Sequence, residues 1–104
     1  MVIESTIIKQ ASDFINCLES KNIHINEAFI FGSHTKGTAT PYSDIDLALV
    51  SSSFSGIRFD DNVKIIKNTP HNFVDIETHP FKPEDFSSDN PFVDEIIKTG
   101  YRLR

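Results

Sequence analysis

Apolar residues near the start of the chain recur at steps of three and four positions, the spacing of one face of an α-helix. This stripe predicts a helix over residues 3–20 and consists of Ile3, Ile7, Ile8, Ala11, Phe14, Ile15 and Leu18. A second, shorter helix is predicted over residues 59–68. A helical turn is predicted at 83–86, and a last helix from Asn90-Pro91 to a stop at Gly100, because proline is tolerated in a first helical turn and glycine is typical of helix ends.

Short apolar or alternating runs predict strands between these helices. The apolar run at 28–31 is typical of a buried strand, and residues 44–50 predict a second buried strand whose first end carries acids. Residues 73–78 alternate with period two, and 101–103 resembles a short edge strand. The serine-rich stretch 51–56 is predicted to be a flexible connector. Together these elements predict an α+β fold, an α/β sandwich in which a small mixed sheet is flanked by helices.

Length and composition narrow the class of protein. A chain of 104 residues has room for one domain, which we place at residues 1–104. Its net charge of −5 argues against a nucleic-acid binder that works through phosphate contacts, and against an anionic membrane surface as partner. No apolar run is long enough to cross a membrane, the N-terminus lacks the features of a signal peptide, and Cys17 has no second cysteine to pair with. We therefore expect a cytoplasmic protein whose core contains much of the phenylalanine set Phe54, Phe59, Phe81, Phe86 and Phe92.

Two acids stand at the start of the second predicted strand. Asp44 and Asp46 are two positions apart, so both point to one face of the strand with Cα atoms roughly 6.5 Å apart. The rest of this strand is apolar, which makes two carboxylates on one face costly unless a cation lies between them. Mg²⁺ is the natural candidate, because it prefers carboxylate oxygens together with substrate phosphates. The four histidines lack the spacing of a metal site, and only His34 is kept as a candidate, since it lies beside the segment described next.

A Gly32-Ser33 pair follows directly after the first predicted strand. Glycine permits a sharp turn and the close approach of a ligand. If a helix starts there, its free N–H groups and the Ser33 hydroxyl can hold phosphate oxygens, and Lys36 can add a positive charge one turn later. The pair alone is a weak signal, but next to two acids it predicts a site for a metal and a triphosphate.

Gly-Ser, ten intervening residues and Asp-x-Asp together resemble the signature of the nucleotidyltransferase superfamily related to DNA polymerase beta. The fuller string from Gly32 to Leu47 is similar to its minimal nucleotidyltransferase branch. This resemblance implies a nucleotidyltransferase-like fold, in which Asp44 and Asp46 are catalytic metal ligands. It further implies nucleotide contacts at Gly32, Ser33, Lys36 and Ser43.

The family also implies a third carboxylate on a later strand, in a Val-Asp-hydrophobic setting. Val74-Asp75-Ile76 matches, so the resemblance implies that Asp75 is the third metal ligand and a catalytic residue that accepts the proton of the acceptor hydroxyl. Glu77 shares its face by alternation and is a second candidate, although we favour a solvated strand end for it. One departure concerns Lys36, which stands where the family commonly has arginine and so keeps the charge without the bidentate fork. A second is Tyr42, at a position where an acid or another polar residue is frequent.

The resemblance implies a mechanism in which two Mg²⁺ ions and ATP serve the transfer of AMP to a hydroxyl. Larger relatives carry a second domain for the acceptor, and minimal members are typically paired with a small helical HEPN protein as antitoxin and toxin. The leading hypothesis is therefore nucleotidyl transfer to such a partner protein. Two alternatives stay open: a non-catalytic binding module that neutralises its partner by complex formation, and an aminoglycoside-type transferase that needs a homodimer to complete its pocket.

Overall fold

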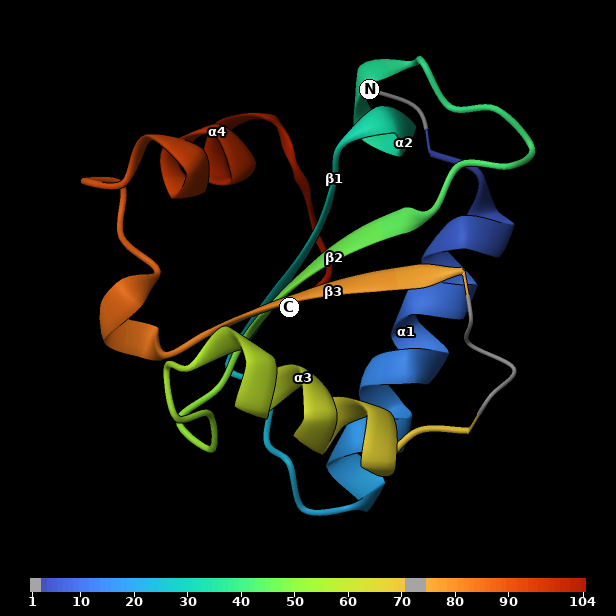
Figure 1. Cartoon of the computed structure of the whole chain (residues 1–104). Helices are drawn as coiled ribbons and strands as arrows, with labels where there is room; N and C mark the ends of the chain where they lie inside the picture. Colours follow the sequence, from blue (N-terminus) through green and yellow to red (C-terminus); the bar gives the residue numbers. More distant parts are fainter. Residues whose placement is uncertain (1–2, 71–74) are drawn as a thin grey trace.

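The structure is a computed structural model that describes residues 3–70 and 75–104 (Figure 1). Helices and strands alternate along most of the chain. Their order is α1 (Ser5–Ser20), β1 (Glu27–Phe31), α2 (Ser33–Lys36), β2 (Ile45–Val50), α3 (Arg58–Lys67), β3 (Ile76–Phe81), the 3-10 turn η2 (Pro83–Asp85), α4 (Pro91–Thr99) and β4 (Tyr101–Arg102).

The four strands form one mixed sheet in the order β3-β2-β1-β4. β1 pairs antiparallel with both β2 and β4, while β2 and β3 run parallel and are joined by the crossover through α3. Pro80 is tolerated inside β3 because this is an edge strand. The carbonyls of Asp75 and Phe81 accept hydrogen bonds from the N–H groups of Ile45 and Ser51, so the odd-numbered residues here direct their backbone polar groups toward β2. Pro80 is even-numbered, and its nitrogen therefore points away from β2.

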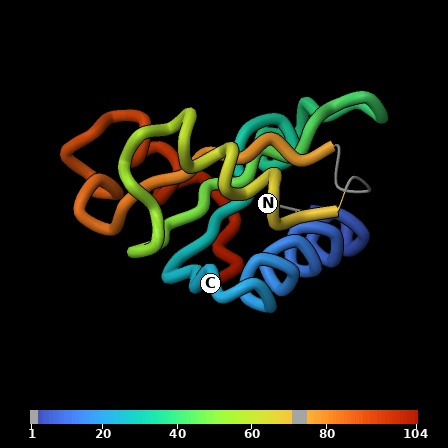
Figure 2. The backbone as a smooth tube through the Cα atoms, turned by 60° about the horizontal axis from the view of Figure 1, so that its bottom comes forward, coloured from blue at the N-terminus to red at the C-terminus, as the bar shows by residue number. Residues whose placement is uncertain are grey.

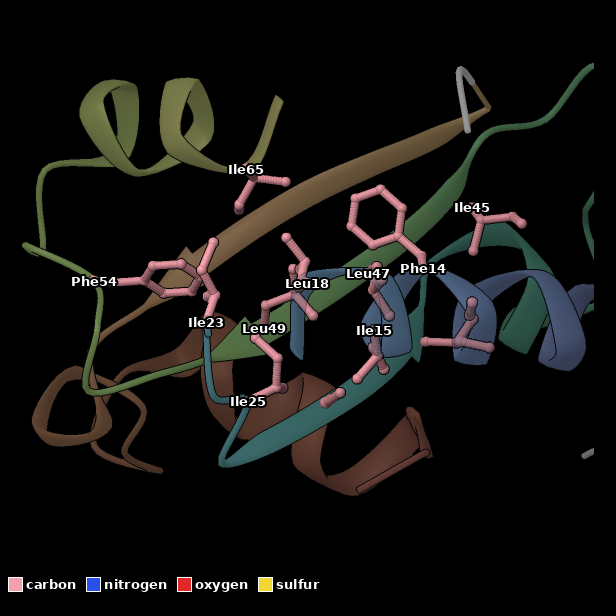
Figure 3. Packing of buried hydrophobic residues seen from close by; sticks show 13 residues of the cluster. Phe14, Ile15, Leu18, Ile23, Ile25, Ile45, Leu47, Leu49, Phe54 and Ile65 are labelled. Carbon is pink, nitrogen blue, oxygen red and sulfur yellow. The ribbon is translucent and has the colours of Figure 1, made fainter. Parts of the chain in front are cut away.

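Each face of the sheet carries its own apolar cluster. On one face, Phe14, Ile15 and Leu18 of α1 pack against Leu47 and Leu49 of β2, with Ile65 of α3 beside them (Figure 3). On the other face, Val93 and Ile96 of α4 and Phe86 pack against Phe29, Ala48 and Val50. The sheet is therefore covered on both sides, by α1 and α3 on one face and by α4 on the other (Figure 1). Asp46 belongs by alternation to the face covered by α4, and it is half-buried there.

Most elements predicted from the sequence are confirmed, including the helix at 3–20, both buried strands, the 83–86 turn and the edge strand at 101–103. The strand predicted at 73–78 is observed as Ile76–Phe81; its first two positions lie outside the described residues. The connector at 51–56 is not loose, because Ser51 and Phe54 are buried. Two of the phenylalanines expected in the core are exposed: Phe59 is 76% and Phe92 44% accessible. Phe59 lies on the outer side of α3, because the opposite side of this helix is the one that buries Ile65.

No described helix is both long and apolar enough to cross a lipid bilayer.

Candidate active site

The turn after β1 brings the backbone directly over a carboxylate. Gly32 has φ +80°, and a Cβ added at this position would lie 2.3 Å from Asp46 Oδ2. Both the backbone angle and the space therefore require glycine here. Phe31 and Asp46 are paired residues of β1 and β2, which is why the turn that follows Phe31 comes to lie over Asp46.

The short helix α2 starts at this turn. Its first hydrogen bonds run from the Thr35 and Lys36 N–H groups to the Gly32 carbonyl. Lys36 Nζ lies 3.4 Å from Glu95 Oε1 of α4, so the predicted phosphate-binding cation forms an exposed ion pair across to the next layer. His34 Nε2 lies 3.4 Å from the Ser43 carbonyl oxygen, which ties α2 to the loop before β2.

A cluster of three polar side chains forms where β2 and β3 run side by side. Asp46 pairs with Glu77 in the parallel register, and His79 follows two positions later on the same face. The ligand atoms of Asp46, Glu77 and His79 all lie within 4.8 Å of one another. His79 Nε2 is 3.3 Å from Asp46 Oδ1 and 3.9 Å from Glu77 Oε1. The imidazole therefore stands between two carboxylates.

The sequence pattern offers Glu77 only as a second candidate for the third carboxylate, and it does not place His79 in the site. We favoured a solvated strand end for Glu77, and its side chain is indeed 53% exposed, but it faces Asp46. His79 was set aside because the histidines lack regular spacing. The signal that could have found it is the period-two alternation Asp75, Glu77, His79, which places all three on one face of a strand.

The other predicted residues lie around this cluster. Asp44 is exposed just before β2, and Asp75 is exposed just before β3, with its carbonyl accepting from Ile45 N–H. Among the described residues, neither carboxylate belongs to the group of three. Ser33, Ser43 and Asp75 line a cavity of about 580 Å³ bounded also by the start of α1. Gly32 and Lys36 line a smaller hollow of about 120 Å³ beside Phe31 and Phe92. Ser43 also has a structural task, since its hydroxyl accepts a hydrogen bond from Thr40 N–H.

The chemistry of the cluster suits a hard divalent cation. Like charges opposite each other on neighbouring strands are destabilising, and Asp46 and Glu77 occupy such positions. A cation between them removes this repulsion, and carboxylate oxygens are the ligands that Mg²⁺ prefers. The Gly32 turn lies directly against the same carboxylate.

Comparison with known proteins decides the family. The model of the nucleotidyltransferase domain family matches residues 11–101, nearly the whole chain. The chain belongs to this family. The motif from Gly32 to Asp46 lies inside the matched region.

Individual relatives agree with this assignment. A "putative protein adenylyltransferase" of Methanocaldococcus jannaschii is 33% identical over 81 residues, which cover 71% of this chain and 54% of the relative. The nucleotidyltransferase domain thus spans about half the length of the curated relative that it matches.

Solved structures confirm the fold. A "putative nucleotidyltransferase" from Sulfolobus solfataricus superposes with a TM-score of 0.65 at 19% identity, covering 94% of this chain and 79% of that one. A structure described as a toxin-antitoxin with AMP-PNP superposes with a TM-score of 0.58 at 19% identity, covering 90% and 72%. The predicted α+β nucleotidyltransferase-like fold is therefore confirmed.

Proposed function

We propose that this nucleotidyltransferase domain transfers AMP from ATP to a hydroxyl group on a partner protein. The observation that carries the proposal is the contact between the Gly32 turn and Asp46, beside Glu77 on the neighbouring strand. The Gly32 turn, whose backbone can come close to a ligand, lies beside Asp46 and Glu77, two carboxylates that can hold a cation. This is what a metal-bound triphosphate requires.

The metal would be held by carboxylates at the ends of β2 and β3. The residues are Asp44 and Asp46, with Asp75 or Glu77 as the third ligand. Two Mg²⁺ ions held by these carboxylates would neutralise phosphate charge and lower the pKa of an acceptor hydroxyl.

The chain's own residues bind and orient the two substrates. The N–H groups at the start of α2 and the Ser33 hydroxyl hold phosphate oxygens, and Lys36, released from Glu95, adds a positive charge. Ser43 and Asp75 lie along the neighbouring cavity, where the rest of the nucleotide fits. The acceptor oxygen forms a bond to the α-phosphorus, the bond to the bridging oxygen breaks, and pyrophosphate leaves. Asp75 accepts the proton of the acceptor hydroxyl.

The identity of the acceptor rests on charge and on the relatives. A net charge of −5 is unsuited to a polynucleotide acceptor. The curated relative is described as a protein adenylyltransferase, and one structural neighbour as part of a toxin-antitoxin pair. These descriptions support a protein acceptor, for which we propose a small helical partner of the HEPN type, with this domain as the antitoxin.

Label transfer from α-³²P-ATP with Mg²⁺ tests the proposal, with a small helical protein of the HEPN type as the candidate acceptor. Asp46→Asn removes the central carboxylate charge, so label on the acceptor is expected to fall to background. The matched control is Asp13→Asn, an exposed acid of α1 whose pair with Lys9 contributes about 0.3–0.5 kcal/mol. It should label the acceptor like the wild type.

Two other results would contradict this proposal. A stable complex without label, unchanged in Asp46→Asn, would identify a non-catalytic binding module. Label on an added aminoglycoside, and not on the protein, would identify a small-molecule transferase.

A further inference from the structure

The position of the His79 ring is fixed by aromatic neighbours. Its side chain is only 12% exposed. Phe31 packs edge-on against it, with ring centres 4.9 Å apart and planes at 66°, and Phe92 lies on a further side at 6.2 Å. With the ring held in this way, its two nitrogens point to fixed partners.

Those partners determine which nitrogen carries the hydrogen. Arg58 Nη2, from the start of α3, lies 3.3 Å from His79 Nδ1, and Asp46 Oδ1 lies 3.3 Å from His79 Nε2. A guanidinium can only donate, so Nδ1 must accept. The hydrogen of the neutral ring is then on Nε2, which donates to Asp46 Oδ1.

We infer that His79 is a positioning residue for the metal-binding carboxylate of Asp46 and not itself a metal ligand, and that Arg58 imposes this role by holding the Nδ1 lone pair. The inference rests on the proposed function and extends it to residues outside the Gly-Ser and Asp-x-Asp motif. A ligating Nε2 would need its lone pair free. The hydrogen would then move to Nδ1, where it would face the N–H donors of Arg58.

The consequence is a carboxylate with one defined orientation. His79 holds Oδ1, while Oδ2 lies against the Gly32 turn. Hydrogen-bonded partners behind a metal ligand fix its direction, and their loss typically lowers metal affinity 10- to 100-fold. Keeping the imidazole nitrogen out of the coordination sphere also leaves an all-oxygen site, which favours Mg²⁺ or Mn²⁺ over Zn²⁺.

Binding of Mn²⁺ to the full chain, followed by electron paramagnetic resonance without nucleotide, tests the positioning role independently of transfer. His79→Gln keeps an N–H donor near the position of Nε2, whereas His79→Phe keeps the aromatic packing and loses both hydrogen bonds. We expect affinity within about threefold of wild type for His79→Gln and a loss of about 10-fold or more for His79→Phe. His24→Phe, at an exposed histidine near Glu19, is the control and should bind like wild type.

Zn²⁺ binding tests the role of Arg58, whose substitution leaves the core untouched because the side chain is exposed. Arg58→Met frees Nδ1 and allows the ring to present an Nε2 lone pair, so the affinity for Zn²⁺ should rise about 10-fold relative to Mn²⁺. The double variant Arg58→Met/His79→Gln should not show this gain.

Several results would overturn the inference. Equal losses of Mn²⁺ affinity in His79→Gln and His79→Phe would mean that His79 is a metal ligand, and a larger loss in His79→Gln than in His79→Phe would mean that it is only a packing residue. An unchanged Zn²⁺ preference in Arg58→Met would remove the role of Arg58. Absence of Mn²⁺ binding in the wild type would overturn the inference together with the metal site. Failure of the proposed transfer is distinguishable, because it would leave Mn²⁺ binding and the difference between the two His79 variants intact.

Discussion

At the scale of single residues, the site depends on the absence of a side chain at Gly32 as well as on the carboxylate of Asp46. Gly32 lacks a Cβ exactly where the Asp46 carboxylate needs room, and its φ of +80° is one that other residues rarely adopt. Gly37 has a similar φ of +74°, but nothing lies within 4 Å of the Cβ position there. Substitutions at the two glycines therefore distinguish the effect of backbone strain, which both share, from the effect of steric contact with Asp46, which only Gly32 has.

Gly32→Ala should displace the Asp46 carboxylate and abolish both Mn²⁺ binding and nucleotidyl transfer. Gly37→Ala carries the same kind of strain, about 1 kcal/mol, and should keep Mn²⁺ binding, because no atom near it belongs to the carboxylate site. Thermal unfolding and Mn²⁺ titration of the two variants provide the measurement. Equal Mn²⁺ affinity in the two would show that contact with Asp46 is unimportant.

At the scale of elements, a buried acid joins a loop to a helix. Asp61, in the first turn of α3, is 2% exposed and accepts hydrogen bonds from Ser55 N–H at 2.7 Å and Gly56 N–H at 3.0 Å. The Ser55 hydroxyl donates to the same carboxylate. This explains why the stretch predicted to be a flexible connector is anchored, and it holds the start of α3, where Arg58 lies, in a defined place.

Asp61→Asn should lower the free energy of unfolding by about 1–3 kcal/mol, because the amide turns an N–H group toward N–H donors. Asp60→Asn, at the exposed neighbour in the same helical turn, should change it by less than about 0.5 kcal/mol. Chemical denaturation of both variants measures the difference. Similar midpoints would argue against anchoring by Asp61.

At the scale of the whole molecule, the C-terminus is tied to the end of the first helix. The C-terminus lies beside the end of α1 (Figure 2), where Arg104 forms an ion pair with Glu19. Glu19 also accepts a hydrogen bond from Ile25 N–H, just before β1. The hydrogen bond from Arg104 is the main reason why the pKa of Glu19 lies below its usual range, and the bond from Ile25 acts in the same direction.

A lowered pKa in the folded state means that ionised Glu19 stabilises the fold above its unfolded pKa, and that this contribution is lost as the pH falls through the folded value. Glu19→Gln should therefore reduce stability at pH 7 by about 0.5–1 kcal/mol, because solvent screens this partly exposed ion pair. The difference from wild type should narrow below about pH 4. Unfolding curves recorded from pH 7 to pH 3 test this, with the exposed Asp89→Asn as control. A difference that is independent of pH would contradict the ionic origin.

Much of the fold and part of the site could be predicted from the sequence, because both depend on local patterns. The apolar stripe of α1, the buried run of β2 and the Asn90-Pro91 start of α4 are confirmed within a few residues. Asn90 accepts a hydrogen bond from Phe92 N–H, as a helix cap should. The burial of each phenylalanine was not predictable in this way, since it depends on which side of a helix the rest of the core occupies.

The sequence by itself determined the family signature: Gly32-Ser33 and Asp44-x-Asp46 are near neighbours in the chain, and their chemistry follows from residue type and spacing. Only the tertiary structure decided that Glu77 and His79 face Asp46, and that Arg58 reaches His79. The physical reason is register. β2 and β3 are separated by a loop and a helix, and a shift of one residue in their pairing would turn Glu77 and His79 to the opposite face. That register is set by packing of the whole sheet between its two apolar clusters, which no local pattern contains.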